Sequence, residues 1–169
     1  RGWRWVAKQV YPQFGGQFEV IHHSEFIADL LRTGRLKVKP TNAGTITFHD
    51  SCYLGRHNGV YDAPRDAIAA ATGLEIAEMP RNRERGFCCG AGGGRMWLEE
   101  HVGKRVNVDR VEEALTLAPK EIAAACPFCS TMLNDGVKQH DKEESVKVID
   151  IAQVVARSLE KRPPPAPLG

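Results

Sequence analysis

The stretch Ile122-Ala-Ala-Ala-Cys-Pro-Phe-Cys129 joins a short apolar run to two cysteines that are three positions apart. The run 122–125 predicts a buried strand, because it is apolar and too short for a helix. Pro127 suits the first turn of a helix, where its missing N–H costs nothing, so a helix is expected to begin there. This segment therefore predicts a strand–helix unit whose thiols lie just beyond the carboxyl end of the strand.

The rest of the chain repeats this alternation. Short apolar runs are separated by helical patterns, which end at residues such as Gly73 and Pro119. Alternation of this kind favours right-handed crossovers onto a mostly parallel sheet. The expected fold is therefore α/β, with a small sheet of about five strands, helices on both faces and a metal site at the carboxyl edge. The expected strands are Phe18–Ile21, Thr45–Phe48, Leu74–Ala77, Ile122–Ala125 and Val146–Ile149. The expected helices lie within 24–34, 64–73, 104–118, 127–137 and 151–159, with Ser24 as an N-cap and Gly136 near the end of the fourth.

A chain of 169 residues has room for one compact domain. Residues 17–160 are predicted to form a cysteine-rich domain, after a remnant of a preceding domain or linker at 1–16, where Arg1–Tyr11 suits a short helix. Residues 161–169 are predicted to form a proline-rich tail. A net charge of +2 without a dense basic stripe argues against nucleic acid as a partner. No apolar run reaches the ~20 residues of a membrane span.

The chain has five cysteines, whereas a secreted disulfide framework normally uses an even number. In a reducing compartment, clustered cysteines more often bind metal or carry out redox chemistry. We therefore expect a cytoplasmic protein, either free or at the cytoplasmic face of a membrane as part of a larger protein. Every cysteine falls beyond the carboxyl end of an expected strand, so the fold should bring them to one rim. The predicted site consists of Cys52, Cys88, Cys89, Cys126 and Cys129.

The surroundings of the cysteines suit thiolates. Cys126 and Cys129 should point the same way on a first helical turn, where the helix N-terminus favours the thiolate. Cys88 and Cys89 precede the glycine-rich run 90–94, whose backbone N–H groups can approach an anion closely. Four arginines near this loop could offset thiolate charge. These are Arg81, Arg83, Arg85 and Arg95.

Two pairs of neighbouring residues have open roles. His49 and Asp50 adjoin Cys52 and either hydrogen-bond to the ligands or shape the loop. His22 and His23 lie at the same rim and are either ligands or proton carriers, or simply a pair at a helix entry.

The cysteine spacing favours an iron–sulfur cluster. A structural zinc ion takes four ligands in a tetrahedron, which would leave one cysteine over, and two adjacent cysteines are an awkward pair for one ion. A cluster of several iron atoms can use all five. Zinc and metal-free thiol redox chemistry remain alternatives at this point. Nucleotide binding is disfavoured, because a GxGxxG motif that began at Gly90 would need glycine where Arg95 stands.

The residues that carry these motifs resemble a known family, the cysteine-rich "CCG" domain found in heterodisulfide reductases, in the iron–sulfur subunits of glycolate oxidases and in lactate-utilisation proteins. The resemblance covers about residues 11–159. It is strongest to the second CCG domain of a membrane-associated iron–sulfur reductase that resembles electron-transfer-flavoprotein dehydrogenase. The matching segments are His49-Asp-Ser-Cys-Tyr-Leu-Gly-Arg56, Gly59-Val-Tyr-Asp-Ala-Pro-Arg65, Gly86-Phe-Cys-Cys-Gly-Ala-Gly-Gly-Gly94 and Cys126-Pro-Phe-Cys129.

The resemblance implies an oxidoreductase domain that relays electrons. It implies that the five cysteines ligate a [4Fe–4S] cluster of cubane or noncubane type, whereas some domains of this family hold zinc or a simpler cluster instead. The implied partners are a first CCG domain and a ferredoxin-like domain of the same or a partner chain, and a flavoprotein electron donor. Quinone and the membrane would be reached only through the full-length protein.

Overall fold

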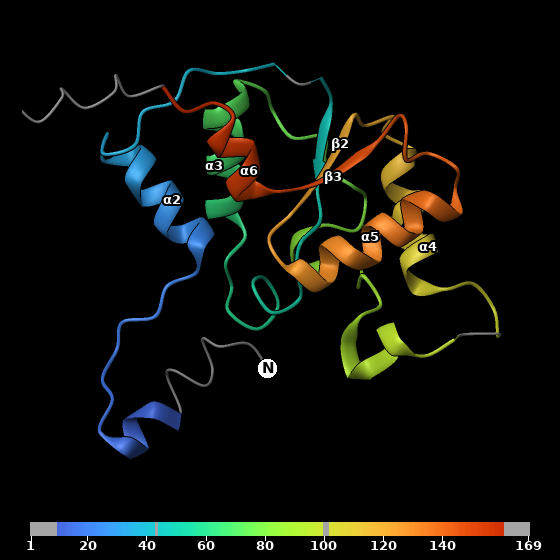
Figure 1. The fold of residues 1–169 in the computed structure, drawn as a ribbon, viewed down its shortest axis with the longest axis horizontal. Coiled ribbons are helices and arrows are strands. Elements are labelled where there is room, and N and C mark those ends of the chain that lie inside the picture. The colour runs from blue at the N-terminus through green and yellow to red at the C-terminus, as the bar shows by residue number, and fades with distance from the viewer. Residues whose placement is uncertain (1–9, 43, 100–101, 161–169) are drawn as a thin grey trace, which may run out of the picture.

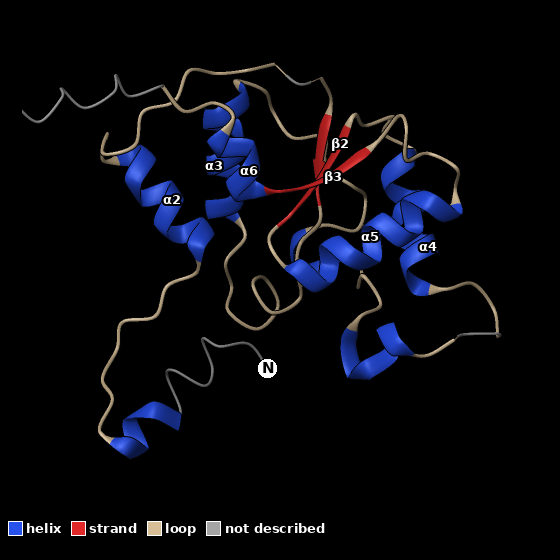
Figure 2. Cartoon of the chain, in the orientation of Figure 1, coloured by secondary structure: helices blue, strands red, loops and turns tan. Residues whose placement is uncertain are grey.

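The computed structural model describes residues 10–42, 44–99 and 102–160. The helix expected within Arg1–Tyr11 lies almost wholly outside the described residues, and so does the tail 161–169. Helices alternate with strands along the described chain (Figures 1 and 2). In chain order the elements are η2 (Tyr11–Phe14), α2 (His23–Arg32), β1 (Ile46–Phe48), α3 (Asp62–Thr72), η3 (Arg83–Arg85), η4 (Gly92–Trp97), α4 (Val106–Leu115), β2 (Glu121–Ala124), α5 (Pro127–Gln139), β3 (Lys147–Asp150) and α6 (Ile151–Ala156).

The described residues form a parallel sheet of three strands in the order β1-β2-β3. Ile46 of β1 lies opposite Glu121 of β2, which in turn lies opposite Lys147 of β3. Figure 1 shows α3 and α6 on one side of the sheet and α4 and α5 on the other. The α/β class, the parallel sheet and the helices on both faces are therefore confirmed, whereas the prediction of about five strands is wrong.

The segment Phe18–Ile21 is not a strand, because no other strand of the described chain lies beside it. Phe18 is 62% exposed and Ile21 is 46% exposed. Phe18 instead meets the edge of the Tyr11 ring, with 5.9 Å between the ring centroids. An extended segment without a neighbour gains no ladder hydrogen bonds, so its apolar composition alone does not make it a strand.

The segment Leu74–Ala77 comes closer to being a strand. Its backbone bonds to β1 once within the described ranges, from Ala77 N–H to the Ile46 carbonyl at 2.9 Å. Pro80 follows soon after and has no N–H to continue a ladder. The chain nevertheless returns to the loop after β1, where Arg83 N–H donates to Asp50 Oδ2, before it reaches Cys88 and Cys89.

Two helix boundaries differ from those expected. The N-cap of α2 is His22 rather than Ser24, because His22 is extended and its ring accepts a hydrogen bond from Ser24 N–H at 3.2 Å. Gly136 does not end α5 but lies inside it. A Cβ atom there would come within 2.6 Å of Val111 Cγ2 and 2.8 Å of the Asn107 carbonyl, so glycine allows α5 to cross α4 closely.

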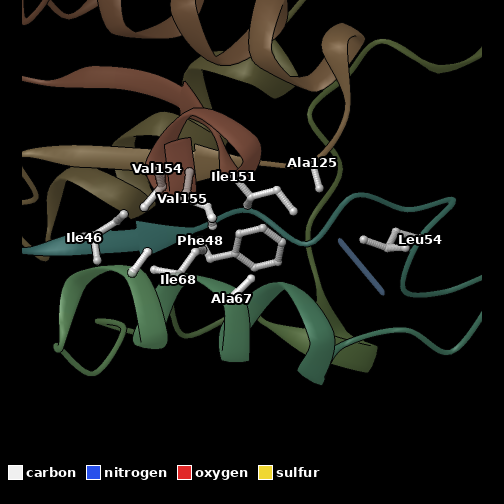
Figure 3. Packing of buried hydrophobic residues seen from close by; sticks show 11 residues of the cluster. Ile46, Phe48, Leu54, Ala67, Ile68, Ala125, Ile151, Val154 and Val155 are labelled. Carbon is white, nitrogen blue, oxygen red and sulfur yellow. The ribbon is translucent and has the colours of Figure 1, made fainter. Parts of the chain in front are cut away.

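The two faces of the sheet bury separate clusters. On one face, Ile46 and Phe48 of β1 pack with Ile68 of α3 and Val154 of α6, and Figure 3 shows these side chains meeting. The cluster on the other face contains cysteines as well as hydrocarbon side chains, so the candidate site is continuous with the core there. Its buried members include Val111, Ile122, Leu133, Cys89 and Cys129.

Candidate metal centre

Two of the three cysteine groups directly follow strands, as predicted. Cys52 lies in the turn-rich loop after β1, and Cys126 lies just beyond β2. Cys126 is the extended residue that precedes α5, Pro127 occupies the first turn, and Cys129 follows within that turn. Because parallel strands end at the same edge of a sheet, both groups lie at its carboxyl edge.

The third group lies in the vicinal-cysteine loop (residues 86–90), which is fastened to the loop after β1. Arg83 N–H donates to Asp50 Oδ2 at 2.7 Å. Arg56 Nη2 donates to the carbonyl at the start of the vicinal-cysteine loop, also at 2.7 Å. These bonds bring the third group to the edge where the other two lie, although no described strand leads directly into this loop.

Inside the vicinal-cysteine loop, Gly90 has a left-handed φ of 87°, and a Cβ atom there would come within 3.1 Å of Val106 Cβ. Only glycine fits this turn without strain. Its N–H donates to Cys88 Sγ at 3.2 Å, so the turn directs a backbone donor at a thiol, as the glycine-rich sequence predicted. The Arg81 guanidinium lies 3.8 Å from the centre of the Phe87 ring. This contact holds Phe87, the residue before Cys88, in place.

The buried centre of the site is formed by His49, Cys89 and Cys129. A ring nitrogen of His49 and the two sulfur atoms all lie within 4.8 Å of one another. His49 is 1% exposed, and each of the two cysteines is 3% exposed. Across the described ranges, this is the one group of three such close ligand atoms from His, Cys, Asp or Glu. The other three cysteines are partly exposed and border it. They are Cys52, Cys88 and Cys126.

Contacts among the thiols shift their pKa values in opposite directions. Hydrogen bonds from Cys129 and Cys88 stabilise the Cys89 thiolate and lower its pKa. Hydrogen bonds to Cys126 and Cys89 raise the pKa of Cys129, and the bond to Cys89 raises that of Cys88. Cys126 shares the single S–H of Cys129 with Cys89, and this contact, helped by backbone N–H groups at the start of α5, lowers the pKa of Cys126 to about 6. Burial, followed by the charge on Cys89, raises the pKa of Cys52. All five thiols therefore interact, and a metal would displace the protons that some of them retain.

A buried ion pair supports the loop that carries Cys52. Arg65 of α3 donates to both carboxylate oxygens of Asp50, at 2.8 and 2.9 Å, and to Glu78 Oε1 at 2.5 Å. Burial alone would raise the pKa of Asp50, but the bonds from Arg65 and the Arg83 N–H outweigh it and lower that pKa. Of the two roles considered for Asp50, the structure supports the shaping of the loop.

His49 is held from behind by Arg110 of α4, whose Nε donates to His49 Nδ1 at 3.1 Å. Burial lowers the pKa of His49, which keeps the ring neutral at pH 7. Within the described ranges, the buried side-chain atoms without a hydrogen-bond partner all come from the β1 segment and from α4. They are Thr47 Oγ1, His49 Nε2, Ser51 Oγ, Asn107 Oδ1 and Arg110 Nη2.

Four of the other charged residues named from the sequence have partners of their own. Arg81 pairs with Glu113 at 2.7 Å, and Arg83 pairs with Asp62 at 2.7 Å, so carboxylates already offset both charges. His22 caps α2 and His23 lies 3.6 Å from Asp150, which agrees with a pair at a helix entry.

Arg110 was not singled out by the sequence. A signal was nevertheless present, because Asn107, Arg110, Val111 and Ala114 recur at helical spacing and all are buried. Two polar residues within an otherwise apolar stripe indicate that the stripe faces something polar.

The donor set fits a thiolate-ligated metal group. Thiolates are the preferred ligands of iron–sulfur clusters and of zinc. His49, which lies with Cys89 and Cys129, has a buried Nε2 without a partner in the described chain, which indicates that another group hydrogen-bonds there. Fold and site together define an α/β domain with a cluster of five thiols at the carboxyl edge of its sheet.

The sequence model of the cysteine-rich domain family, designated CCG, matches residues 46–134. The match spans all five cysteines and more than half of the chain. The chain therefore belongs to the CCG cysteine-rich domain family, as the resemblance had indicated.

Several curated proteins share nearly the whole of this chain. The probable iron–sulfur-binding oxidoreductase FadF of Bacillus subtilis is 50% identical over 154 residues, which cover 91% of this chain and 22% of that protein. The EtfAB:quinone oxidoreductase of Syntrophomonas wolfei is 48% identical, with 92% of this chain and 22% of that protein covered. One subunit of the dihydromethanophenazine:CoB–CoM heterodisulfide reductase of Methanosarcina barkeri is 40% identical, with 91% and 38% covered. The chain thus spans between about a fifth and two fifths of the length of these relatives.

None of the described helices combines the length and the apolar character that crossing a membrane requires.

Proposed function

We propose that this chain is an electron-transfer domain of an iron–sulfur oxidoreductase. Its five cysteines, Cys52, Cys88, Cys89, Cys126 and Cys129, would hold a [4Fe–4S] cluster of cubane or noncubane type. Such a cluster supplies one-electron redox chemistry, which the side chains of this domain do not supply by themselves. The proposal rests chiefly on the convergence of five interacting thiols from three distant segments around the buried Cys89 and Cys129.

The protein residues contribute binding, orientation and partial shielding from water. Cys89 and Cys129 are buried and would anchor the inner side of the group. Cys52, Cys88 and Cys126 are partly exposed and leave one side of the centre near solvent, where a redox partner can approach. No acid or base is required for electron relay alone. The oxidoreductase names of the three relatives support this role.

We further propose that the domain works as part of a larger assembly in the cytoplasm or at the cytoplasmic face of a membrane. A first CCG domain and a ferredoxin-like domain would accompany it, in the same chain or a partner chain, and a flavoprotein would supply electrons. Quinone and the membrane would be reached through the full-length protein. The support is that the relatives are several times longer than this chain and that one of them is named as an EtfAB:quinone oxidoreductase.

Metal and sulfide analysis of the anaerobically purified chain tests the proposal. We expect a brown protein with iron and labile sulfide in equal amounts, about four of each per chain. Mössbauer spectroscopy would then distinguish the cubane from the noncubane arrangement. A colourless protein with one zinc ion would contradict the proposal and favour a structural zinc domain. Absence of both metals would leave a thiol–disulfide module.

A further inference from the structure

His49 has a fixed position and one fixed contact behind the metal centre. Its side chain is almost fully buried, and its Nδ1 accepts a hydrogen bond from Arg110 Nε at 3.1 Å. Arg110 is itself fully buried and cannot easily turn away. Its Nη1 donates to the Arg81 carbonyl and to Glu113 Oε2, each at 3.0 Å. The donor to His49 is therefore held by two further bonds.

This contact decides where the ring proton of His49 lies. A guanidinium group has only N–H donors, accepts no hydrogen bond and stays protonated in proteins. Nδ1 must therefore present its lone pair to Arg110, so the single proton of the neutral ring is on Nε2. Nε2 is also the nitrogen that finds no hydrogen-bond partner in the described part of the chain. A protonated nitrogen has no lone pair for a metal, although His49 lies close enough to Cys89 and Cys129 to be mistaken for a ligand.

We infer that in the metal-loaded protein His49 is not a metal ligand but an Nε2–H donor to the sulfur of Cys89, and that Arg110 is the positioning residue that enforces this tautomer. This inference rests on the proposed iron–sulfur function, which assigns no role to either residue. A hydrogen bond to a ligand sulfur stabilises the more negative, reduced state more than the oxidised state. His49 would therefore raise the reduction potential of the bound group.

The tautomer can be measured without any variant and without relying on a cluster. Nitrogen-15 NMR of the chain labelled at histidine separates the two ring nitrogens of His49 by their chemical shifts. We expect Nδ1 to be unprotonated and Nε2 to be protonated. The reverse assignment would overturn the inference. A chain that contains neither iron nor sulfide would refute the proposed function, whereas this measurement on the same sample would still support or overturn the tautomer.

In the iron-loaded chain, two variants separate a donor from a ligand. His49→Leu removes the N–H, and His49→Gln keeps an N–H donor near the same place. We expect both to retain iron and sulfide. The equilibrium constant for one-electron reduction should fall about tenfold in His49→Leu, or about 59 mV, and clearly less in His49→Gln. A purely structural role would not restore the potential in the glutamine variant.

Pulsed EPR of the labelled, reduced protein gives an independent result on the unsubstituted chain. We expect a weak nitrogen-15 coupling from His49, of the kind transmitted through a hydrogen bond, that disappears in His49→Leu. The strong coupling of a directly bonded nitrogen would overturn the inference. Loss of iron in both His49 variants, while the folded structure persists, would do the same.

Discussion

The two faces of β1 differ in the kind of side chain that they bury. On one face, Ile46 and Phe48 are buried among hydrocarbon side chains of α3 and α6 (Figure 3). On the other, Thr47 and the following His49 are equally buried, yet each has a polar atom without a hydrogen-bond partner among the described residues. An unpaired buried polar atom costs about 1–3 kcal/mol. One face therefore stabilises the fold, while the other gives up stability to place polar groups and thiols at the edge of the sheet.

The largest effect should come from Cys89→Ser, which removes one of the two buried thiols of the candidate site. Cys89 contacts Cys88, Cys129 and His49, so its loss should remove nearly all of the native cluster or convert it to another form, with the fold partly retained. Iron and sulfide analysis, the visible spectrum and far-UV circular dichroism measure these outcomes. Thr131→Ala is the matched control, because Thr131 is exposed on the same helix as Cys129. Unchanged iron and an unchanged spectrum would show that Cys89 is not a ligand.

The next effect concerns the apolar face. Ile68→Ala should lower the free energy of unfolding by about 2–5 kcal/mol, because Ile68 is fully buried against β1 and leaves a cavity. Iron bound per folded chain should stay the same, since the cysteines lie on the other face and at the edge. Urea unfolding and metal analysis of the folded fraction test both statements. A large loss of iron per folded chain would show that the two faces are not independent.

A smaller effect of opposite sign should appear on the polar face. Thr47→Val removes a fully buried hydroxyl that has no partner within the described chain, and valine suits a strand. The free energy of unfolding should therefore rise by about 1 kcal/mol.

Thr72→Val is the matched control for this change. Thr72 is also buried, but its hydroxyl donates to the Ile68 carbonyl at 2.8 Å and accepts from Leu74 N–H at 3.2 Å. The control should therefore lose about 1 kcal/mol of stability. Equal destabilisation by both variants would mean that the Thr47 hydroxyl has a partner in solution.

The last effect, of about the same size, depends on pH and concerns Asp150, the N-cap of α6. Its carboxylate accepts from Ala152 N–H at 2.8 Å, so Asp150→Ala should cost about 1 kcal/mol at neutral pH. Burial opposes ionisation, but the bonds from His23 and Ala152 lower the pKa of Asp150 below its usual 3.8. A carboxyl with a lowered folded pKa stabilises fully above its unfolded value and loses this contribution as pH falls through the folded one.

The cost of Asp150→Ala should therefore shrink as pH falls below 3.8, which urea unfolding at a series of pH values would show. Asp150→Asn keeps a good cap that does not titrate and should stay close to the wild type at neutral pH. A cost of Asp150→Ala that is the same at every pH would show that the carboxylate charge does not support the cap.

The parts of the fold that local chemistry controls could be predicted from the sequence. Pro127 and the apolar run before Cys126 predicted a strand, a helix start and two thiols at its first turn, and the structure has all three. Strand number could not be predicted in this way, because a strand exists only where a neighbour completes its hydrogen bonds. Phe18–Ile21 has no such neighbour among the described strands, and Leu74–Ala77 makes one backbone hydrogen bond to β1 within the described ranges.

The surroundings of the candidate site were harder to predict than its cysteines. His49 and Arg110 are 61 positions apart in the sequence, and only the packing of separate elements makes them neighbours. Gly136, which the sequence placed near the end of a helix, allows α5 to cross α4 closely. Contacts of this kind come from packing between elements, which the pattern within one element does not report.

The partly exposed thiols of the candidate site also make the metal-free chain prone to oxidation and alkylation. Cys126 is partly exposed and has a pKa of about 6, so it is mostly thiolate at neutral pH. Thiolates that solvent reaches are the ones that peroxide and alkylating reagents attack first. Cys89 shares the thiolate character but is buried. Oxidation of the metal-free protein in air should therefore begin at Cys126. An oxidised Cys126 could no longer bind the metal group, while the fold would remain intact.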